Sequence, residues 1–378
     1  MTLPLSDTAG MTGRTNRPTV PSESRQMRDF QDFLRASRRY LDGPLVAAIS
    51  ADYDRLCAER GVGRPQSEIE ARPVVDRLIP FQLYQWMYRH LQQFKYSRND
   101  LGIVAACARD RDALTAALAR AEARAPERLR LDPTLAMPDY YTAVDFHQQP
   151  GGVWSDALGG FIYEMGRRTT VPQHMDPAAV YRILFDALPQ DRHFERVLDW
   201  GTGTGAGLIA WKMLHPESEG HGVDLAAPCL RLAHLRALEA GLDLTFALPY
   251  CAALLFGSAT FGLILHMFTL HEIPPTDLPA VLREAARVLK PGGIMAGPEF
   301  HLTPGDPLFN VIQRSHAWTN NETYSACWFD FDIEGAAWDA GFSKVTVSPF
   351  TEHMSGGGRP GTEGRPRTGL WNLYVFEK

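Results

Sequence analysis

The chain has 378 residues, of which 45% are hydrophobic and 22% charged, with a net charge of −6. This length fits two domains better than one, and the composition is that of a protein that buries a full core. The acidic balance argues against nucleic acid as a partner, and the absence of a long uncharged apolar run argues against a membrane-spanning helix.

Residues 1–27 are rich in Thr, Ser, Pro and Arg and lack the apolar middle of a secretory signal, so they predict a disordered leader. The five cysteines are scattered and never spaced as CxxC. This pattern argues against a disulfide framework and against a zinc site, and we expect no metal. It favours the reducing cytoplasm.

Residues 28 to about 130 are predicted to be helical, because apolar residues recur there at steps of three and four. A first stripe consists of Phe30, Phe33, Leu34, Ser37 and Leu41. A second segment is broken by Pro80 and continues with Leu83, Trp86, Met87, Leu91 and Phe94. A third helix, RDALTAALARAEARAPE, is expected to stop at Pro126. All three stripes are assigned to the core.

The character of the chain changes at about residue 131. The segment PDYYTAVDFHQQPGGVWSDALGGFIYEMG is dense in aromatic residues, glycine and proline. This composition favours an ordered layer of loops over a helix.

From about residue 176 the pattern alternates between strands and helices. The expected strands are RVLDW, HGVDL, LTF, FGLILHM, GIMAGPEF, FSKVTVSPF and LWNLYVFEK, and LPAVLREAARVL is the clearest helix. Such alternation predicts an α/β fold with a doubly wound, largely parallel sheet. The last two strands are joined without a helical pattern, so we expect an antiparallel C-terminal hairpin.

A glycine-rich loop, VLDWGTGTGAG, follows the first of these strands. Glycine is needed where a strand turns sharply into a helix and the backbone approaches a ligand closely. Gly201, Gly203 and Ala206 also satisfy the dinucleotide-binding pattern GxGxxG/A, and Asp224 lies at the expected distance for a ribose carboxylate. The loop alone therefore leaves NAD open as a ligand.

The rest of the segment resembles the class I S-adenosylmethionine-dependent methyltransferases, in particular the branch of the quinone-biosynthesis methyltransferases. The resemblance covers about residues 176–378 and rests on the glycine loop, the acidic end of the second strand and the LKPGG turn after LREAARV. Asp199 supports it, because a carboxylate there repels a pyrophosphate but tolerates the cationic end of S-adenosylmethionine. The expected fold is thus a Rossmann-like methyltransferase sheet with an N-terminal helical domain.

The resemblance also implies roles for individual residues. Gly201, Gly203 and Gly205 would line the methionine part of the cofactor, Asp224 would hold the ribose hydroxyls and Asp199 would lie near the amino group. The carboxylate that commonly binds adenine is missing from PYCAALLFGSATF. The candidates for binding adenine are Tyr250 and Cys251. Leu225 and His266 are further candidates for contacts with the cofactor.

A second resemblance concerns HQQPGGVWSD and HAWTNNETYSACWFDFD, which are similar to segments of a little-characterised group of bacterial methyltransferases with an N-terminal helical domain. We therefore divide the chain into the leader 1–27, a helical domain with its loop layer at 28–175, and a cofactor-binding domain at 176–378 with an insertion at 301–340. Residues 28–175 are expected to roof the acceptor pocket and to offer contacts for a homodimer.

Catalytic candidates follow from the rule that open α/β sheets bind ligands beyond the carboxyl ends of their strands. His271 and Glu272 follow the fourth strand, and Glu299 and His301 follow the fifth. Histidine is the side chain best suited to take a proton near neutral pH. We expect His271 first, and then His301, to act as the base, with Glu272 as a further catalytic candidate.

The acceptor pocket is expected to combine aromatic side chains with a few polar groups. The insertion supplies most of these side chains, including the polar groups of Asn320 and Glu322. The loop layer supplies the others. The substrate-binding candidates are His147, Trp154, His316, Trp318, Asn321 and Tyr324.

The predicted function is methyl transfer from S-adenosylmethionine to a small aromatic or otherwise apolar metabolite, at O, N or C. Two alternatives keep the cofactor: a rearrangement or cyclisation without methyl transfer, and a non-catalytic S-adenosylmethionine-binding module. An NAD-linked oxidoreductase ranks last, because no nicotinamide-side signal accompanies the loop.

Overall fold

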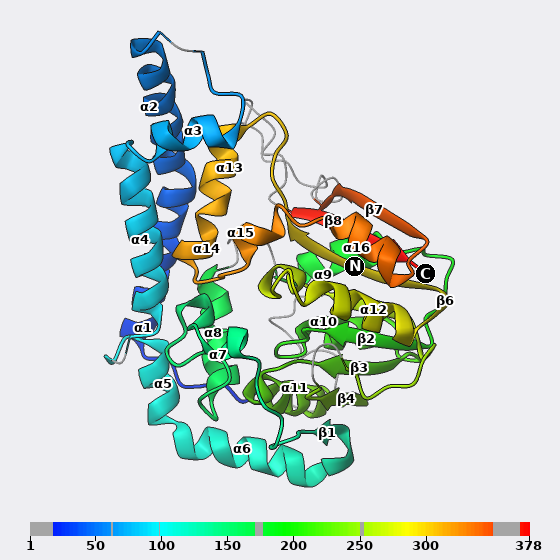
Figure 1. Ribbon diagram of the computed structural model, residues 1–378. Coiled ribbons are helices and arrows are strands. Elements are labelled where there is room, and N and C mark those ends of the chain that lie inside the picture. The colour runs from blue at the N-terminus through cyan, green and yellow to red at the C-terminus, as the bar shows by residue number, and fades with distance from the viewer. Residues whose placement is uncertain (1–17, 62, 98, 171–176, 250–252, 351–370) are drawn as a thin grey trace.

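The computed structural model describes residues 18–61, 63–97, 99–170, 177–249, 253–350 and 371–378. The N-terminal part is helical, as predicted, and its helices stand beside the sheet (Figure 1). The helices of this part are α1 (Arg25–Tyr40), α2 (Val46–Glu59), α3 (Glu68–Val75), α4 (Ile79–Lys95), α5 (Ile103–Arg109), α6 (Arg111–Arg124), α7 (Asp139–Thr142) and α8 (Gly159–Thr170). No helix within these ranges is both long and apolar enough to cross a membrane.

Eight strands form one sheet in the order β1-β4-β3-β2-β5-β6-β8-β7. All neighbours are parallel except β6–β8 and β7–β8, so the doubly wound sheet and its antiparallel C-terminal hairpin are confirmed. The two-residue strand β1 was not predicted. The strands are β1 (Leu129–Arg130), β2 (Arg196–Trp200), β3 (Glu219–Val223), β4 (Leu244–Ala247), β5 (Phe261–His266), β6 (Leu289–Phe300), β7 (Lys344–Pro349) and β8 (Trp371–Glu377).

Helices cover both faces of this sheet, which explains why β2 and β5 are nearly continuous apolar runs. Buried side chains of α9 and α10 pack on one face, and those of α12 and α16 pack on the other. The helices of this part are α9 (Pro177–Asp186), α10 (Ala206–Leu214), α11 (Ala227–Glu239), α12 (Leu278–Val288), α13 (Pro307–Arg314), α14 (His316–Thr319), α15 (Ser325–Trp328) and α16 (Ile333–Ala340).

The helical half and the sheet half share buried cores. Leu232 and Leu235 of α11 belong to one apolar cluster with residues of α5, α6 and α8. Within the insertion, Leu308 and Val311 of α13 are buried among residues of α1 to α4, and Figure 1 shows α13 lying beside those helices. The insertion therefore returns the chain from the sheet to the helical half.

Three local expectations need correction. Helix α1 begins at Arg25, inside the proposed leader, because the Ser24 side chain accepts a hydrogen bond from the Met27 amide and caps it. Pro80 does not break a helix but lies in the first turn of α4, where proline is tolerated. The end of the proposed loop layer is the helix α8. A Cβ on its Gly160 would lie 2.4 Å from the Pro228 carbonyl, so this glycine permits close packing on α11.

The apolar stripe assigned to the core of α4 is only partly buried. Leu91 is buried, but Leu83, Trp86 and Phe94 are exposed at the surface. Phe33 of the first stripe is also exposed, whereas Leu34 and Leu41 are buried. Periodicity identified the helices correctly, but it does not distinguish a face that packs inside the chain from one that faces outward.

Candidate functional site

The glycine loop connects β2 to α10 and adopts the backbone conformation for which glycine was expected. Gly201, Gly203 and Gly205 have φ angles of 74°, 52° and 80°. L-residues rarely adopt such angles. A Cβ on Gly201 would also lie 2.4 Å from the Thr269 hydroxyl. The loop therefore makes a tight turn at the carboxyl end of the sheet without side chains at Gly201 and Gly203, and both residues line a cavity there.

A Gly205→Ala substitution should destabilise the protein more than Gly241→Ala does. Both positions have left-handed backbones, but a Cβ at Gly205 would lie 2.9 Å from Ala233 Cβ, whereas nothing lies within 4 Å of one at Gly241. Both variants pay about 1 kcal/mol of backbone strain, and crowding should add about 1–3 kcal/mol at Gly205 only. Urea unfolding measures the difference, and equal losses would contradict the close approach.

Asp224 lies directly after β3 and faces the glycine loop. Its Oδ2 accepts a hydrogen bond from the Gly203 amide and its Oδ1 accepts one from the Ala226 amide, both at 2.8 Å. Burial raises the pKa of Asp224 to about 6 against the effect of these hydrogen bonds. The carboxylate is therefore mainly ionised at pH 7, and each oxygen keeps a lone pair for a ligand hydroxyl.

Asp199, at the end of β2, is buried behind the loop. Its Oδ2 accepts a hydrogen bond of 2.7 Å from the Thr202 hydroxyl, and burial raises its pKa to about 6. Asp199 does not line the cavity at this end of the sheet. It acts on the glycine loop through its hydrogen bond with Thr202.

One cavity joins the glycine loop, the segment after β3, the segment after β5 and the loop that contains His147. Gly201, Gly203, Asp224 and Leu225 line it, whereas Gly205 does not. Aromatic side chains form much of the remaining wall, and Thr269 and Glu272 add polar groups. The aromatic wall residues are Tyr140, Tyr141, Phe146, Tyr163, Trp200 and Phe268.

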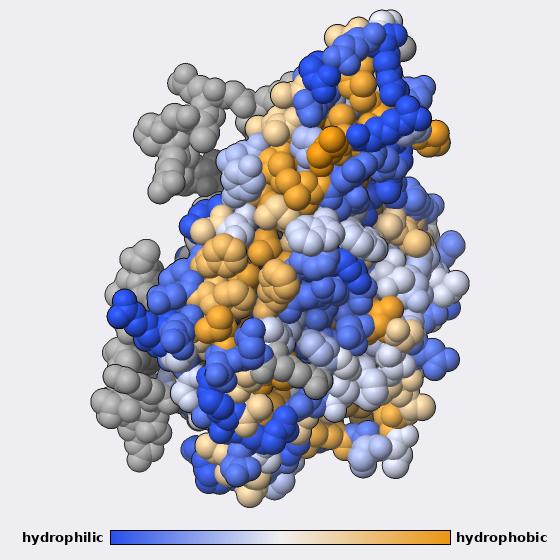
Figure 2. All heavy atoms as spheres, turned by 90° about the vertical axis from the view of Figure 1, so that its left-hand side faces the viewer, coloured by the Kyte–Doolittle hydropathy of each residue, from blue (hydrophilic) through white to orange (hydrophobic). Residues whose placement is uncertain are grey.

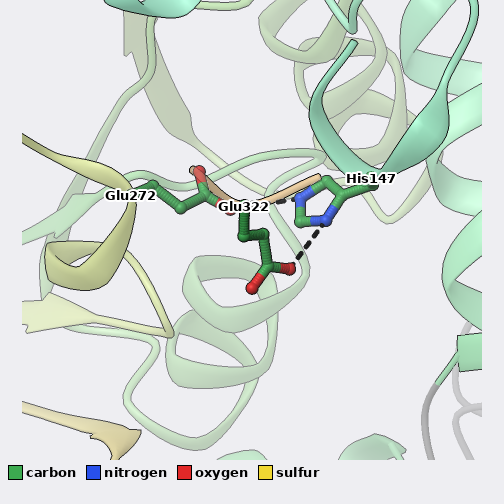
Figure 3. Close-up of side chains that lie close together, drawn as sticks. All are labelled: His147, Glu272 and Glu322. Atoms are coloured by element: carbon green, nitrogen blue, oxygen red, sulfur yellow. Dashed lines mark ion pairs between the residues drawn. The ribbon is translucent and has the colours of Figure 1, made fainter. Parts of the chain in front are cut away.

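His147 bridges two carboxylates at this cavity (Figure 3). Its Nε2 lies 3.1 Å from Glu272 Oε1, and its Nδ1 lies 3.0 Å from Glu322 Oε1. Burial by itself favours the neutral ring, but the two carboxylates outweigh it and raise the pKa of His147 to about 9. The ring is therefore an imidazolium at neutral pH.

The same three side chains include donors of the kind that bind divalent ions, and their donor atoms lie within 4.8 Å of one another. The two carboxylates, however, contact opposite nitrogens of one ring instead of converging on one point (Figure 3). This geometry is that of a hydrogen-bonded bridge, and we assign no metal to it.

The backbone around the bridge is strained. His147, Gln148, Phe268 and Asn321 have φ angles between 54° and 60°, although none of them is glycine. The Asn321 side chain donates a hydrogen bond of 2.8 Å to the Asp145 carbonyl and so ties the insertion to the loop of His147. Strained residues of this kind cluster at functional sites.

Glu322 and Glu299 extend the bridge into a buried network. Glu322 Oε2 lies 3.2 Å from His316 Nε2 and 3.4 Å from His271 Nε2. Glu299 Oε2 lies 2.6 Å from His271 Nδ1, and its Oε1 accepts hydrogen bonds from the amides of Thr269 and Leu270. The alternation of carboxylates and imidazoles compensates the buried charges.

His271, the first candidate for the base, is held inside this network. It is 2% exposed, does not line the cavity, and faces a carboxylate at each ring nitrogen. Burial alone lowers its pKa, but Glu299 and Glu322 reverse the effect and hold the pKa well above that of a free imidazole. A ring that keeps its proton cannot accept another, so this placement does not fit the expected role.

The other two histidines expected at the strand ends also lie away from the cavity wall. His301, the second candidate for the base, is half-buried, and its Nδ1 lies 2.8 Å from the Leu302 carbonyl. His266 is fully buried with its Nδ1 3.3 Å from Glu299 Oε1. Neither placement favours the role expected from the sequence.

The remaining candidates are divided between the site and the surface. Tyr324 packs edge-on against Tyr140 of the cavity wall, with ring centroids 6.0 Å apart. Trp318 is 49% exposed and lies against Arg89, and Trp154 is half-buried near Gly152; neither lines the cavity. Two cofactor candidates, Tyr250 and Cys251, lie outside the described residues.

Sequence reasoning placed Glu322 among the polar groups of the acceptor pocket but did not predict its bridge to His147, and it gave no role to the wall residue Tyr163. Glu322 follows two asparagines in the insertion, and only its burial at 3% exposure distinguishes it from a surface carboxylate. Tyr163 lies on α8, the segment predicted as loop.

Comparison with known proteins identifies the segment that carries the glycine loop. A family described as "Methyltransferase domain" matches residues 197–293. The chain is 34% identical over 120 residues to the demethylmenaquinone methyltransferase of Thermus thermophilus, covering 32% of this chain and 53% of that protein. It is 30% identical over 118 residues to the ubiquinone biosynthesis O-methyltransferase of Bordetella avium, covering 31% and 47%. The matches thus span about half the length of these curated relatives.

Among solved structures, phosphoethanolamine N-methyltransferase 2 of Haemonchus contortus, in complex with S-adenosyl-L-methionine, aligns with 65% of this chain and 60% of its own. The identity is 17% and the TM-score is 0.43.

Proposed function

We propose that this chain, whose residues 197–293 form a class I S-adenosylmethionine-dependent methyltransferase domain, transfers the methyl group of that cofactor to a small aromatic or otherwise apolar acceptor. One observation carries the proposal: a single cavity joins Gly201, Gly203 and Asp224 to the paired side chains of His147 and Glu272. The residues that suit the cofactor and the side chains that can donate or accept a proton thus line the same cavity.

The residues present fit the cofactor. The left-handed glycines, which have no side chain, let the backbone of the loop approach the ligand closely, and the Asp224 carboxylate suits the two ribose hydroxyls as a charged double acceptor. Leu225 adds an apolar contact at the wall. When bound, S-adenosylmethionine supplies an electrophilic methyl group on a positively charged sulfur.

The aromatic wall supports a small, flat or apolar acceptor. Five of the wall side chains, namely Tyr140, Tyr141, Phe146, Tyr163 and Phe268, come from four separate segments. Aromatic surfaces stack favourably on other aromatic rings. The names of the curated relatives, which refer to menaquinone and ubiquinone synthesis, support the same class of acceptor.

His147 and Glu272 are our candidates for the acid–base work. The Glu272 carboxylate accepts the proton that the acceptor loses, and the His147 imidazolium stabilises the negative charge that develops on the acceptor atom. When held beside Gly203 and Asp224, S-adenosylmethionine would supply the methyl group for that atom. His271 acts as a positioning residue that holds Glu322 and Glu299.

The helical half contributes to the roof of this site. Gln92 of α4 is fully buried and donates a hydrogen bond to Asn320, which in turn donates to Glu322. The Arg38 guanidinium donates to Gln92 Oε1 at 2.8 Å. This chain of contacts supports the proposal that residues 28–175 position the acceptor side of the pocket.

Binding and turnover test the proposed function together. We expect S-adenosylmethionine and S-adenosylhomocysteine to bind with 1:1 stoichiometry in titration calorimetry, and NAD not to bind. With methyl-labelled cofactor and a panel of phenols and hydroquinones, the label should appear in a small apolar product together with S-adenosylhomocysteine. Binding of NAD in place of S-adenosylmethionine, or transfer of the label to protein or nucleic acid only, would contradict the proposal.

A further inference from the structure

Helix α4, whose buried Gln92 contacts the roof of the pocket, presents an apolar stripe on its outer face. The stripe, here called the α4 stripe, consists of Ile79, Leu83, Trp86, His90 and Phe94. The exposed fractions are 76% for Ile79, 43% for Leu83, 55% for Trp86 and 49% for Phe94. Figure 2, which faces this side of the molecule, shows a band of hydrophobic side chains crossing it.

The stripe is ordered along the helix. Its members are three or four residues apart, which is the spacing of a helix seam that meets a second helix. The rings of Trp86 and His90 lie 4.3 Å apart, and those of His90 and Phe94 lie 6.3 Å apart. Such a continuous exposed apolar surface marks an interaction site more often than single exposed residues do.

The charges of the helix select the partner. The exposed residues of α4 from Ile79 to Phe94 include no acidic or basic side chain. Arg89 is turned aside, with its guanidinium 4.8 Å from the centre of the Trp318 ring. A partner with a strongly charged surface would lose solvation here without gaining an ion pair. An equally uncharged surface fits better, and the α4 stripe itself is one.

We propose that α4 pairs with α4 of a second copy of this chain, antiparallel, about a twofold axis that passes between Trp86 and Met87. In that register Ile79 lies opposite the second copy's position 94 and Leu83 opposite position 90, so that apolar and ring side chains meet along the seam. The contact is isologous, because the same surface serves both copies.

The ends of the helix favour the antiparallel direction. Arg77 precedes α4, Asp100 follows it, and both side chains are exposed. Neither forms an ion pair within the part of the chain that the structure describes. In this register Arg77 lies opposite position 96 at the end of the other copy's α4, four residues before Asp100, so the antiparallel pair places these opposite charges at the same end of the interface, whereas a parallel pair would place like charges together. The α4 stripe forms the centre of the interface, and α14 with Trp318 lies beside it.

Sedimentation equilibrium of the full chain tests the pairing. We expect a dimer for the wild type, and we expect Trp86→Arg to raise the dissociation constant by about 30-fold or more, since central aromatic residues dominate such contacts. Trp338→Arg is the matched control, because Trp338 is 60% exposed on α16, on another part of the surface. Circular dichroism checks that each variant is folded.

A charge exchange tests the direction of the helices. Arg77→Asp and Asp100→Arg should each weaken the dimer, and the double variant should restore it, because the opposite charges again face each other. A wild-type monomer at every concentration would overturn the proposal and leave another segment or a different protein as the occupant of the stripe. A dimer that Trp86→Arg leaves intact would overturn it as well.

Discussion

A His147→Asn variant should lose methyl transfer by about 10²–10⁴-fold in kcat while it keeps its affinity for S-adenosylmethionine. The asparagine tolerates the left-handed backbone at this position, where φ is 55°, so the substitution removes the imidazole without adding strain. The physical reason for the loss is the missing positive charge beside the developing negative charge of the acceptor. Initial rates with the labelled cofactor and calorimetry on the same preparation measure the two effects.

Glu272→Gln should cause a loss of similar size, because the amide cannot accept the proton. His193→Asn is a suitable control: His193 is also paired with a glutamate, Glu217, at 3.6 Å, but its side chain is 61% exposed and remote from the cavity wall. If His147→Asn turned over at the wild-type rate, the acid–base role of the bridge would be wrong, whatever the cofactor affinity.

The bridge also predicts a dependence on pH. The pKa of His147 is about 9 in the folded protein and near 6.5 for a free imidazole. Because the folded value is the higher one, its stabilisation is complete below pH 6.5 and is lost as the pH rises through 9. This rise in the pKa of His147 corresponds to a contribution of at most about 3 kcal/mol to the free energy of unfolding. The difference in unfolding free energy between the wild type and His147→Asn should therefore shrink between pH 6 and pH 10.

An Asp224→Ala variant should bind S-adenosylmethionine about a hundredfold more weakly. Two hydrogen bonds to a charged acceptor, at about 1.5 kcal/mol each, amount to about 3 kcal/mol. Asp224 also accepts hydrogen bonds from the amides of Gly203 and Ala226, so the melting temperature must show that the loop remains folded. Titration calorimetry gives the affinity.

Asp243→Ala is the matched control for this loss. Asp243 is 75% exposed and pairs with Arg128 at 3.1 Å, away from the cavity. In the wild type, affinity should also fall as the pH decreases through about 6, where the Asp224 carboxylate becomes protonated. Unchanged affinity in Asp224→Ala would show that another group holds the ribose.

Two expectations concern segments that the structure does not describe. Residues 351–369 form a glycine-rich connection without apolar anchors, so we expect it to be mobile, but the whole of it lies outside the described residues. The adenine candidates Tyr250 and Cys251 lie in the second such segment. Both expectations stay predictions.

The sequence by itself determined the succession of strands along the chain from β2 onward, the glycine loop, the acidic end of β3 and the C-terminal hairpin. These features depend on local rules: a strand buried on both faces is a continuous apolar run, and a left-handed backbone calls for glycine, as at Gly201. Asp224 could be placed because it directly follows a strand whose neighbour in the sheet carries the loop.

Only the tertiary structure decided which histidine faces the cavity and which apolar face stays outside. The sequence favoured His271 as the base and gave His147 only as a contact for the acceptor, but His271 is buried between two carboxylates away from the cavity, whereas His147 lines it. Likewise, Leu91 and Trp86 belong to one periodic pattern, and only the packing of α4 against its neighbouring helices buries the former. Contacts between residues far apart in the chain set burial and pKa, and no local pattern contains them.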